Sequence, residues 1–307
     1  MVLEIARQEL TIALRNRWTL IIALIFGVLL VSISYVGMLS EGFSGVQTFT
    51  RTTSSIMNLV LYLVPLFGLI AGTVVFTGDR GSTELLYAQP LSRSTVAFGK
   101  ILGVQASIAV STFGGFLCGA VVIAIGNGVS GIGRYAAMVG FALLLSQIFV
   151  GISFCISVIA HRTSKAFGMA LGAWFFFVLL YDLLAIGLGL VLRGSSVNMA
   201  IFLSLFGNPV DIVRVATLLL LENASSFGVA GAALQRFLGG SEVSVLVLVL
   251  SLFVWVAMPI ILALRALRRQ DQLAFDDLFA SARKHIAFFT PGHFLLEERV
   301  GPPDFIA

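Results

Sequence analysis

The chain alternates between long apolar runs and short polar connections. A helix needs about 20 predominantly apolar residues to cross the hydrocarbon core of a bilayer, and six runs reach that length. Five of them carry no Asp, Glu, Lys or Arg, and the fifth along the chain contains Asp182. The pattern predicts an all-α polytopic membrane protein with six transmembrane helices, at Trp18–Leu39, Thr52–Gly78, Ile101–Gly126, Tyr135–Ala160, Ala166–Leu192 and Val243–Leu264.

Composition supports this class and excludes a soluble domain. Only 11% of the 307 residues are charged and 58% are hydrophobic, with a mean hydropathy of +1.03. A soluble domain carries about 25% charged residues. The net charge of +4 is explained by topology rather than by nucleic acid, because basic residues gather at the cytoplasmic face of membrane proteins.

The first 17 residues have a different pattern. Apolar residues recur there at helical spacing, and charged or polar residues occupy the opposite side. The stretch is too charged to span a bilayer. It predicts an amphipathic helix lying in the membrane interface at residues 1–17, with Leu3, Ala6, Leu10, Ala13 and Leu14 on the apolar side.

The distribution of Lys and Arg predicts the orientation. With both termini in the cytoplasm, only five of the 19 basic residues face outward and the other 14 face inward, as the positive-inside rule requires. We therefore expect a multi-pass protein of a bacterial or archaeal cytoplasmic (inner) membrane, with a cytoplasmic tail at residues 265–307. The five outward residues are Arg51, Arg134, Arg193, Arg214 and Arg236.

Three pairs of glycines are spaced four residues apart within the spans. Such small-xxx-small pairs let two helix backbones approach closely. Helix contacts are therefore expected at Gly68/Gly72, Gly115/Gly119 and Gly168/Gly172.

The connection between the fifth and sixth spans, residues 193–242, is long and predicted to be external. Within it, Asn208 can cap a short helix, Pro209 suits the first helical position, and Asp211 favours the positive end of the helix dipole. We expect this helix to lie partly in the membrane or against another protein. The candidate contacts for an external partner are Asn208, Pro209, Asp211 and Arg214.

Asp182 is the one charge inside a predicted span. A carboxylate at membrane depth costs about 2.5–3.5 kcal/mol on insertion scales, so it needs a partner, a proton or a wet cavity. One reading makes Asp182, with Tyr181 beside it, a switch or substrate-path residue. In the other reading, Asp182 has a structural role and forms a hydrogen bond to a neighbouring helix through Tyr181.

Catalytic chemistry is not indicated. The three histidines are all in predicted cytoplasmic segments, and the sequence has no HExxH, no paired carboxylates within a span and no phosphate-binding GxxxxGK[ST] loop. The two cysteines lie singly inside apolar runs. We expect no enzyme activity, no metal site and no cofactor in this chain.

The polar stretch between the second and third spans, residues 78–93, is the most informative segment. Asp79 and Glu84 bracket Arg80, and an apolar patch at residues 85–88 is stopped by Pro90. Three consecutive apolar or aromatic residues in a short cytoplasmic loop favour an amphipathic helix that fits a groove in a partner.

This stretch resembles the coupling-helix signature of ABC transporter permeases of the type-2 exporter class. The resembling segments are DRGSTELL at 79–86, AQPLSR at 88–93 and GK at 99–100, together with ARQEL at 6–10 and RNRW at 15–18. The resemblance implies two separate ATPase subunits that bind ATP and Mg, a second copy of this chain, and a surrounding bilayer. It implies ATPase contacts at Asp79, Arg80, Glu84, Leu85, Leu86, Gln89, Pro90 and Arg93.

Two further stretches are similar to the NosY-type subgroup, the permeases of nitrous-oxide-reductase maturation transporters. These are YDLL at 181–184 and NPVD at 208–211 followed by Arg214. The subgroup implies a periplasmic accessory protein and a part in assembling a copper enzyme outside the membrane.

Two other functions are compatible with a polytopic chain. An ion-coupled secondary transporter would act without an ATPase, and it predicts inverted repeats and several intramembrane ionisable groups. A membrane anchor would transmit force to an external partner at residues 193–242.

Overall fold

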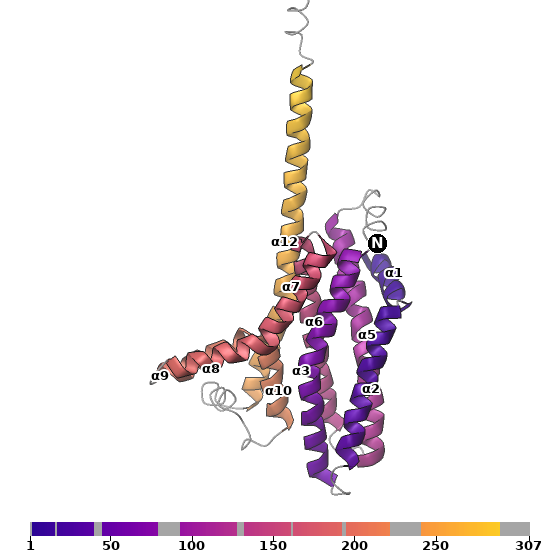
Figure 1. Cartoon of the computed structure of the whole chain (residues 1–307), viewed down its shortest axis with the longest axis vertical. Coiled ribbons are helices and arrows are strands. Elements are labelled where there is room, and N and C mark those ends of the chain that lie inside the picture. Colours follow the sequence, from indigo (N-terminus) through magenta and orange to yellow (C-terminus); the bar gives the residue numbers. More distant parts are fainter. Residues whose placement is uncertain are drawn as a thin grey trace, which may run out of the picture. The chain divides into compact units, whose positions relative to one another are not determined.

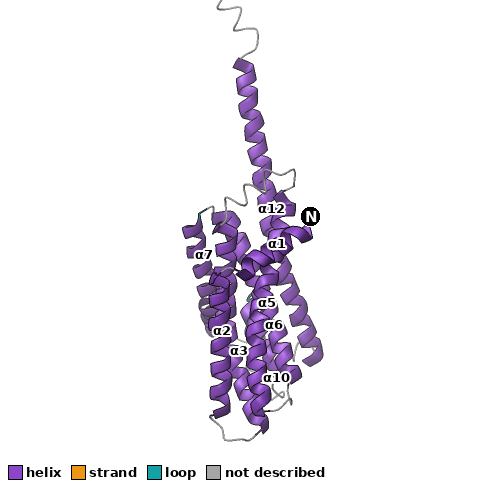
Figure 2. Cartoon of the chain, turned by 90° about the vertical axis from the view of Figure 1, so that its right-hand side faces the viewer, coloured by secondary structure: helices purple, strands orange, loops and turns teal. Residues whose placement is uncertain are grey.

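The computed structural model describes residues 2–15, 17–39, 45–78, 93–127, 132–160, 162–191, 195–221 and 241–288. All regular secondary structure in these residues is helical (Figure 2), which confirms the all-α class. Residues 1–263 form one compact unit and residues 264–307 form another. The helix α12 (Ser241–Phe288) begins in the first unit and ends in the second.

Four long helices form the main bundle of the first unit. They are α2 (Arg17–Leu39), α3 (Gly45–Gly78), α5 (Arg93–Asn127) and α6 (Ile132–Ala160). They run side by side in both views (Figures 1 and 2), with α3 packed along α6 and α2 packed along α5. The N-terminal α1 (Val2–Arg15) lies against the start of α5.

The remaining helices follow in short pieces. The fifth predicted span comprises α7 (Thr163–Phe175), a π-helical turn η1 (Phe176–Leu180) and α8 (Tyr181–Val191). Next come α9 (Ser195–Phe206) and α10 (Pro209–Leu221). The last of these packs against α3 and α6, so part of the predicted external connection belongs to the core of the bundle.

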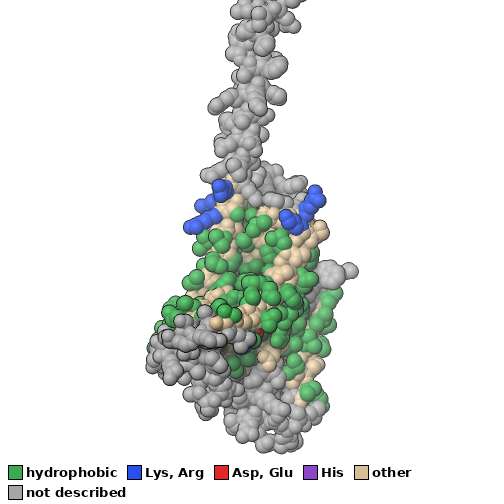
Figure 3. All heavy atoms as spheres, turned by 60° about the vertical axis from the view of Figure 1, so that its left-hand side comes forward, with side chains coloured by type: hydrophobic (Ala, Val, Ile, Leu, Met, Phe, Trp, Pro, Cys, Tyr) green, Lys and Arg blue, Asp and Glu red, His purple; other side chains and the backbone are tan. Residues whose placement is uncertain are grey.

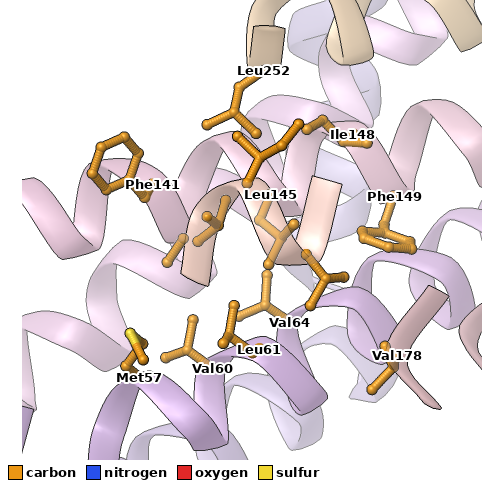
Figure 4. Close-up of a cluster of buried hydrophobic side chains, with 14 of the residues drawn as sticks. Met57, Val60, Leu61, Val64, Phe141, Leu145, Ile148, Phe149, Val178 and Leu252 are labelled. Carbon is orange, nitrogen blue, oxygen red and sulfur yellow. The ribbon is translucent and has the colours of Figure 1, made fainter. Parts of the chain in front are cut away.

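Apolar side chains fill the centre of the bundle and also cover its outside. Figure 4 shows Leu61 and Val64 of α3 facing Leu145 and Phe149 of α6, with Val178 of η1 beside them. The face drawn in Figure 3 is largely apolar, with Lys and Arg side chains gathered at one end. A water-soluble protein does not expose so large an apolar surface, so this exterior fits lipid.

Five helices of the described residues are long and apolar enough to cross a membrane: Ile56–Thr77, Thr95–Val122, Ile132–Ala160, Thr163–Leu188 and Val243–Arg269. The first predicted span, Trp18–Leu39, coincides with α2, but its described apolar segment is only Leu24–Ile33. The protein is therefore a multi-pass helical bundle, and the count of six remains a prediction.

Glycines allow the closest contacts between helices. A Cβ at Gly68 would lie 3.2 Å from Phe149 Cβ, and one at Gly72 would overlap the side chain of Ser153, so α3 and α6 meet at the first predicted pair. Gly115 of α5 similarly meets Phe26 of α2. Around the third pair, Gly168/Gly172, the described residues leave open space.

A further glycine pair, which is not one of the three expected pairs, allows α1 to pack closely against α5. A Cβ at Gly99 would lie 2.9 Å from Ile5 Cβ, and one at Gly103 would lie 2.6 Å from both Ala6 O and Glu9 Cβ. Ile5 is buried in this contact, whereas Leu3 is 81% exposed. The apolar residues of α1 are therefore divided between α5 and the surroundings.

This contact between α1 and α5 can be tested with Gly103→Ala. The added methyl group is expected to weaken the contact of α1 with α5 by about 1 kcal/mol. The fraction of molecules in which α1 is detached from α5 should then rise roughly five-fold. The readout is maleimide labelling of Ile5→Cys in a Cys118→Ser, Cys155→Ser background. The control is Gly114→Ala in the same helix, where a Cβ meets nothing within 4 Å. Equal labelling in both variants would contradict the close contact of α1 with Gly103.

Candidate functional site

The expected ATPase-contacting segment lies almost entirely outside the described residues. The helix α3 ends at Gly78 and α5 begins at Arg93, and these two helices pack against each other. The segment between them therefore joins two neighbouring helices of the bundle. Outside the described residues lie Asp79, Arg80, Glu84, Leu85, Leu86, Gln89 and Pro90, and the side chain of Arg93 is also outside them.

The other candidate residues meet where the fifth span changes direction. At η1 the helix widens into one π-helical turn, and α7 and α8 meet there at an angle (Figure 1). Such bulges bend a helix and loosen its ladder of backbone hydrogen bonds. At this bulge the backbone oxygen of Phe177 accepts a hydrogen bond of 2.9 Å from the side chain of Asn208.

Asn208 stands at the corner between α9 and α10 and is fully buried. Its Oδ1 accepts a 3.0 Å hydrogen bond from the backbone N–H of Val210, while its Nδ2 donates to Phe177 O and, at 3.0 Å, to Asp211 Oδ2. With Pro209 as the first residue of α10, this confirms the expected helix cap. Both polar atoms of the Asn208 side chain are thus used within the chain.

One guanidinium group binds two carboxylates at this corner. Arg214 Nη1 donates to Asp182 Oδ2 at 2.9 Å and to Asp211 Oδ1 at 2.8 Å. The first contact joins α10 to α8, and the second lies within the first turns of α10. The side chains of Arg214, Asp182 and Asp211 are 28%, 35% and 14% exposed. A partly buried triad of this kind makes charge-assisted, directional hydrogen bonds.

Two aromatic side chains, from α8 and α12, donate hydrogen bonds at the same corner. The Tyr181 hydroxyl donates to Ser204 O of α9 at 2.7 Å, and Trp255 Nε1 of α12 donates to Phe206 O at 3.0 Å. A Cβ at Gly207 would overlap the Tyr181 hydroxyl, so only glycine leaves room for this bond. Backbone oxygens at a helix end need such donors where water is scarce.

Burial changes the acidity of Asp211, which belongs to α10 and not to a candidate span. The pKa of Asp211 is raised from 3.8 to about 7. Desolvation is the main cause, the Arg214 guanidinium opposes the rise, and the nearby Asp182 carboxyl adds to it. Burial disfavours a charged carboxylate more than a neutral acid. Asp211 is therefore able to take up a proton near neutral pH.

The arrangement supports structure and proton binding rather than covalent catalysis. The described residues contain no group of three or more His, Cys, Asp or Glu side chains that could hold a metal ion. At the corner itself, the polar side chains are engaged with one another or with backbone oxygens.

The structure brings together residues that sequence patterns assigned to two separate roles. The intramembrane candidates Tyr181 and Asp182 lie against Arg214, Asp211 and the buried Asn208, which were expected to meet an external partner. The direct partner of Asp182 is Arg214 rather than Tyr181. Sequence reasoning missed Gly207, Trp255 and the bulge at Phe177; of these, only Gly207, directly before the Asn-Pro helix start, carries a turn signal.

Comparison with known proteins places the chain among transporters. The family model described as ABC-2 family transporter protein matches residues 3–272. A relative from Stutzerimonas stutzeri, named as a probable ABC transporter permease protein NosY, is 33% identical over 278 residues, covering 87% of this chain and 98% of the relative. A relative of the same name from Pseudomonas aeruginosa is 33% identical over 272 residues, covering 87% and 97%.

Proposed function

This chain belongs to the ABC-2 family of transporter proteins, and we propose that it is a membrane subunit whose movements are driven by ATP hydrolysis in separate ATPase subunits. The match to the family over residues 3–272 is the observation that supports this most strongly. The candidate spans and the apolar exterior agree with a membrane subunit. In this role the chain is a permease and not itself an enzyme.

The proposed seat of the ATPase is the segment 78–93. It links the end of α3 to the start of α5, and α3 packs along α6 at the centre of the bundle. A push on this segment would therefore act on two helices at once and, through α3, on the core. Rigid-body movement of packed helices is a common way to convert such a push into a conformational change.

The complete machine in this proposal holds two copies of the chain and two ATPase subunits, with ATP and Mg bound by the ATPases. The likeness to NosY permeases supports extending the proposal to a periplasmic accessory protein and to the maturation of a copper enzyme. In that case ATP hydrolysis would either export a substrate or transmit force to the accessory protein.

The ATPase seat is tested by Leu85→Asp combined with Leu86→Asp. Placing two carboxylates in an apolar groove is expected to abolish the complex, because truncating or charging a central anchor typically costs 2 kcal/mol or more. The measurements are co-purification with the cognate ATPase and its rate of ATP hydrolysis in the complex. We expect loss of the complex and a rate equal to that of the ATPase alone.

A matched control adds the same charge without removing an apolar anchor: Ser82→Asp combined with Ser92→Asp. If the leucine variant still binds and stimulates the ATPase, this seat is wrong. Transport by the purified chain alone in vesicles with an ion gradient would instead support the secondary-transporter alternative.

A further inference from the structure

The triad at the α9–α10 corner has an imbalance of charge. Asp182 and Asp211 both direct an oxygen at the same atom, Arg214 Nη1, at 2.9 and 2.8 Å. If both acids were ionised, the cluster would carry two negative charges and one positive charge. Like charges this close disfavour full ionisation, as in other sites where two carboxylates share one position.

Among the residues that the structure describes, no second cation acts on Asp211 to restore the balance. The groups around Asp211 are Arg214 of α10 and the uncharged Asn208 directly before α10, and α8 contributes Asp182 and Tyr181. The turn η1 and the described part of α9 contain no titratable side chain. No described side chain of the packed helices α3 and α6 contributes to the acidity of Asp211.

We propose that Asp182 and Asp211 together bind one proton, and that losing this proton loosens the joint between α8 and α10. With the proton bound, one carboxylate balances Arg214 and the second carboxyl group is neutral. When the proton leaves, the two carboxylates repel each other and compete for one guanidinium group. The attachment of α8 to α10 is then weaker.

The acidity of Asp211 agrees in direction with this proposal. Its pKa in the folded protein is about 7 and its ordinary value is 3.8. The folded state therefore holds the proton more tightly than the unfolded state does. The resulting stabilisation is complete below about pH 4 and is lost as the pH rises through about 7.

The first test uses the purified full-length chain in detergent, without any ATPase. The wild-type melting temperature is measured from pH 5 to pH 8.5 and is expected to fall by at least about 2–4 °C over this range. Asp211→Asn and Asp182→Asn each leave one carboxylate for Arg214, so in both variants this fall should be mostly abolished. A slope that is unchanged in both variants overturns the proposal.

A second measurement keeps the proposal testable if a variant does not fold. Infrared difference spectra of the wild-type chain between pH 5 and pH 8.5 should contain a band from a protonated carboxyl group that is lost near pH 7. The band should be absent from whichever Asp→Asn variant folds. If the wild type shows no such band, the shared proton does not exist. Because no step involves ATP, the result is independent of the proposed coupling to an ATPase.

Discussion

Replacing Arg214 with glutamine is expected to destabilise the protein by about 3 kcal/mol at neutral pH. Removing one member of a buried ion pair leaves the other charge unpaired, at a typical cost of 3–5 kcal/mol. We take the low end because the Asp182 side chain is 35% exposed. In a chain of this size the loss corresponds to a fall of roughly 5 °C in melting temperature, measured by differential scanning fluorimetry in detergent.

Companion variants separate the charge effect from simple loss of packing. Adding Asp182→Asn to Arg214→Gln removes one of the two unpaired carboxylates and should restore part of the stability, and adding Asp211→Asn as well should restore more. Arg214→Lys keeps the charge but not the forked geometry, so an intermediate value is expected. A melting temperature for Arg214→Gln equal to that of the wild type would contradict the importance of the triad.

Gly72→Val is the second change expected to have a large effect. Any Cβ at this position overlaps the side chain of Ser153 on α6, which is fully buried and donates a 2.7 Å hydrogen bond to Val150 O. The helices α3 and α6 would have to separate at the centre of the bundle. Overpacking of this kind costs about 1–3 kcal/mol, and we expect the upper value.

The cause can be isolated by making room on the opposite helix. Combining Gly72→Val with Ser153→Gly removes the overlapped side chain and should recover about half of the lost melting temperature. Gly140→Val on α6 is the matched control, because a Cβ there meets nothing within 4 Å. The close contact of α3 and α6 would be refuted if the two valine variants melted at the same temperature.

The helices themselves were largely predictable from the sequence. The predicted span Tyr135–Ala160 corresponds to α6 at Ile132–Ala160, because a run of apolar residues records directly where a helix can sit in lipid. The start of α10 was also predictable from the sequence, because Asn208 caps the helix and Pro209 is its first residue. Both signals are local, and they depend on neighbouring residues alone.

The assembly of the corner was not predictable, because it depends on distant pairs. Asp182 and Arg214 lie 32 residues apart in the chain, with α9 between them, and nothing in either local pattern shows that they meet. The run of aromatic residues around Phe177 reads as an ordinary apolar span, so the π-helical turn carried no signal. The glycine pairs show the same limit, because spacing does not reveal which pairs meet another helix. Gly68/Gly72 makes a close contact, whereas the equally spaced Gly168/Gly172 meets nothing within 4 Å among the described residues.

The π-helical turn also determines which way everything after it faces. An α-helix advances by about 100° per residue, so the single extra residue accommodated at Phe176–Leu180 rotates α8 by about that angle relative to a regular continuation of α7. Tyr181 and Asp182 follow immediately, and their directions toward Ser204 and Arg214 are set by this rotation. The turn thus works as a phase shift in the helix: removing one residue from it would leave Asp182 in the sequence but aim it roughly a quarter turn away from its cation.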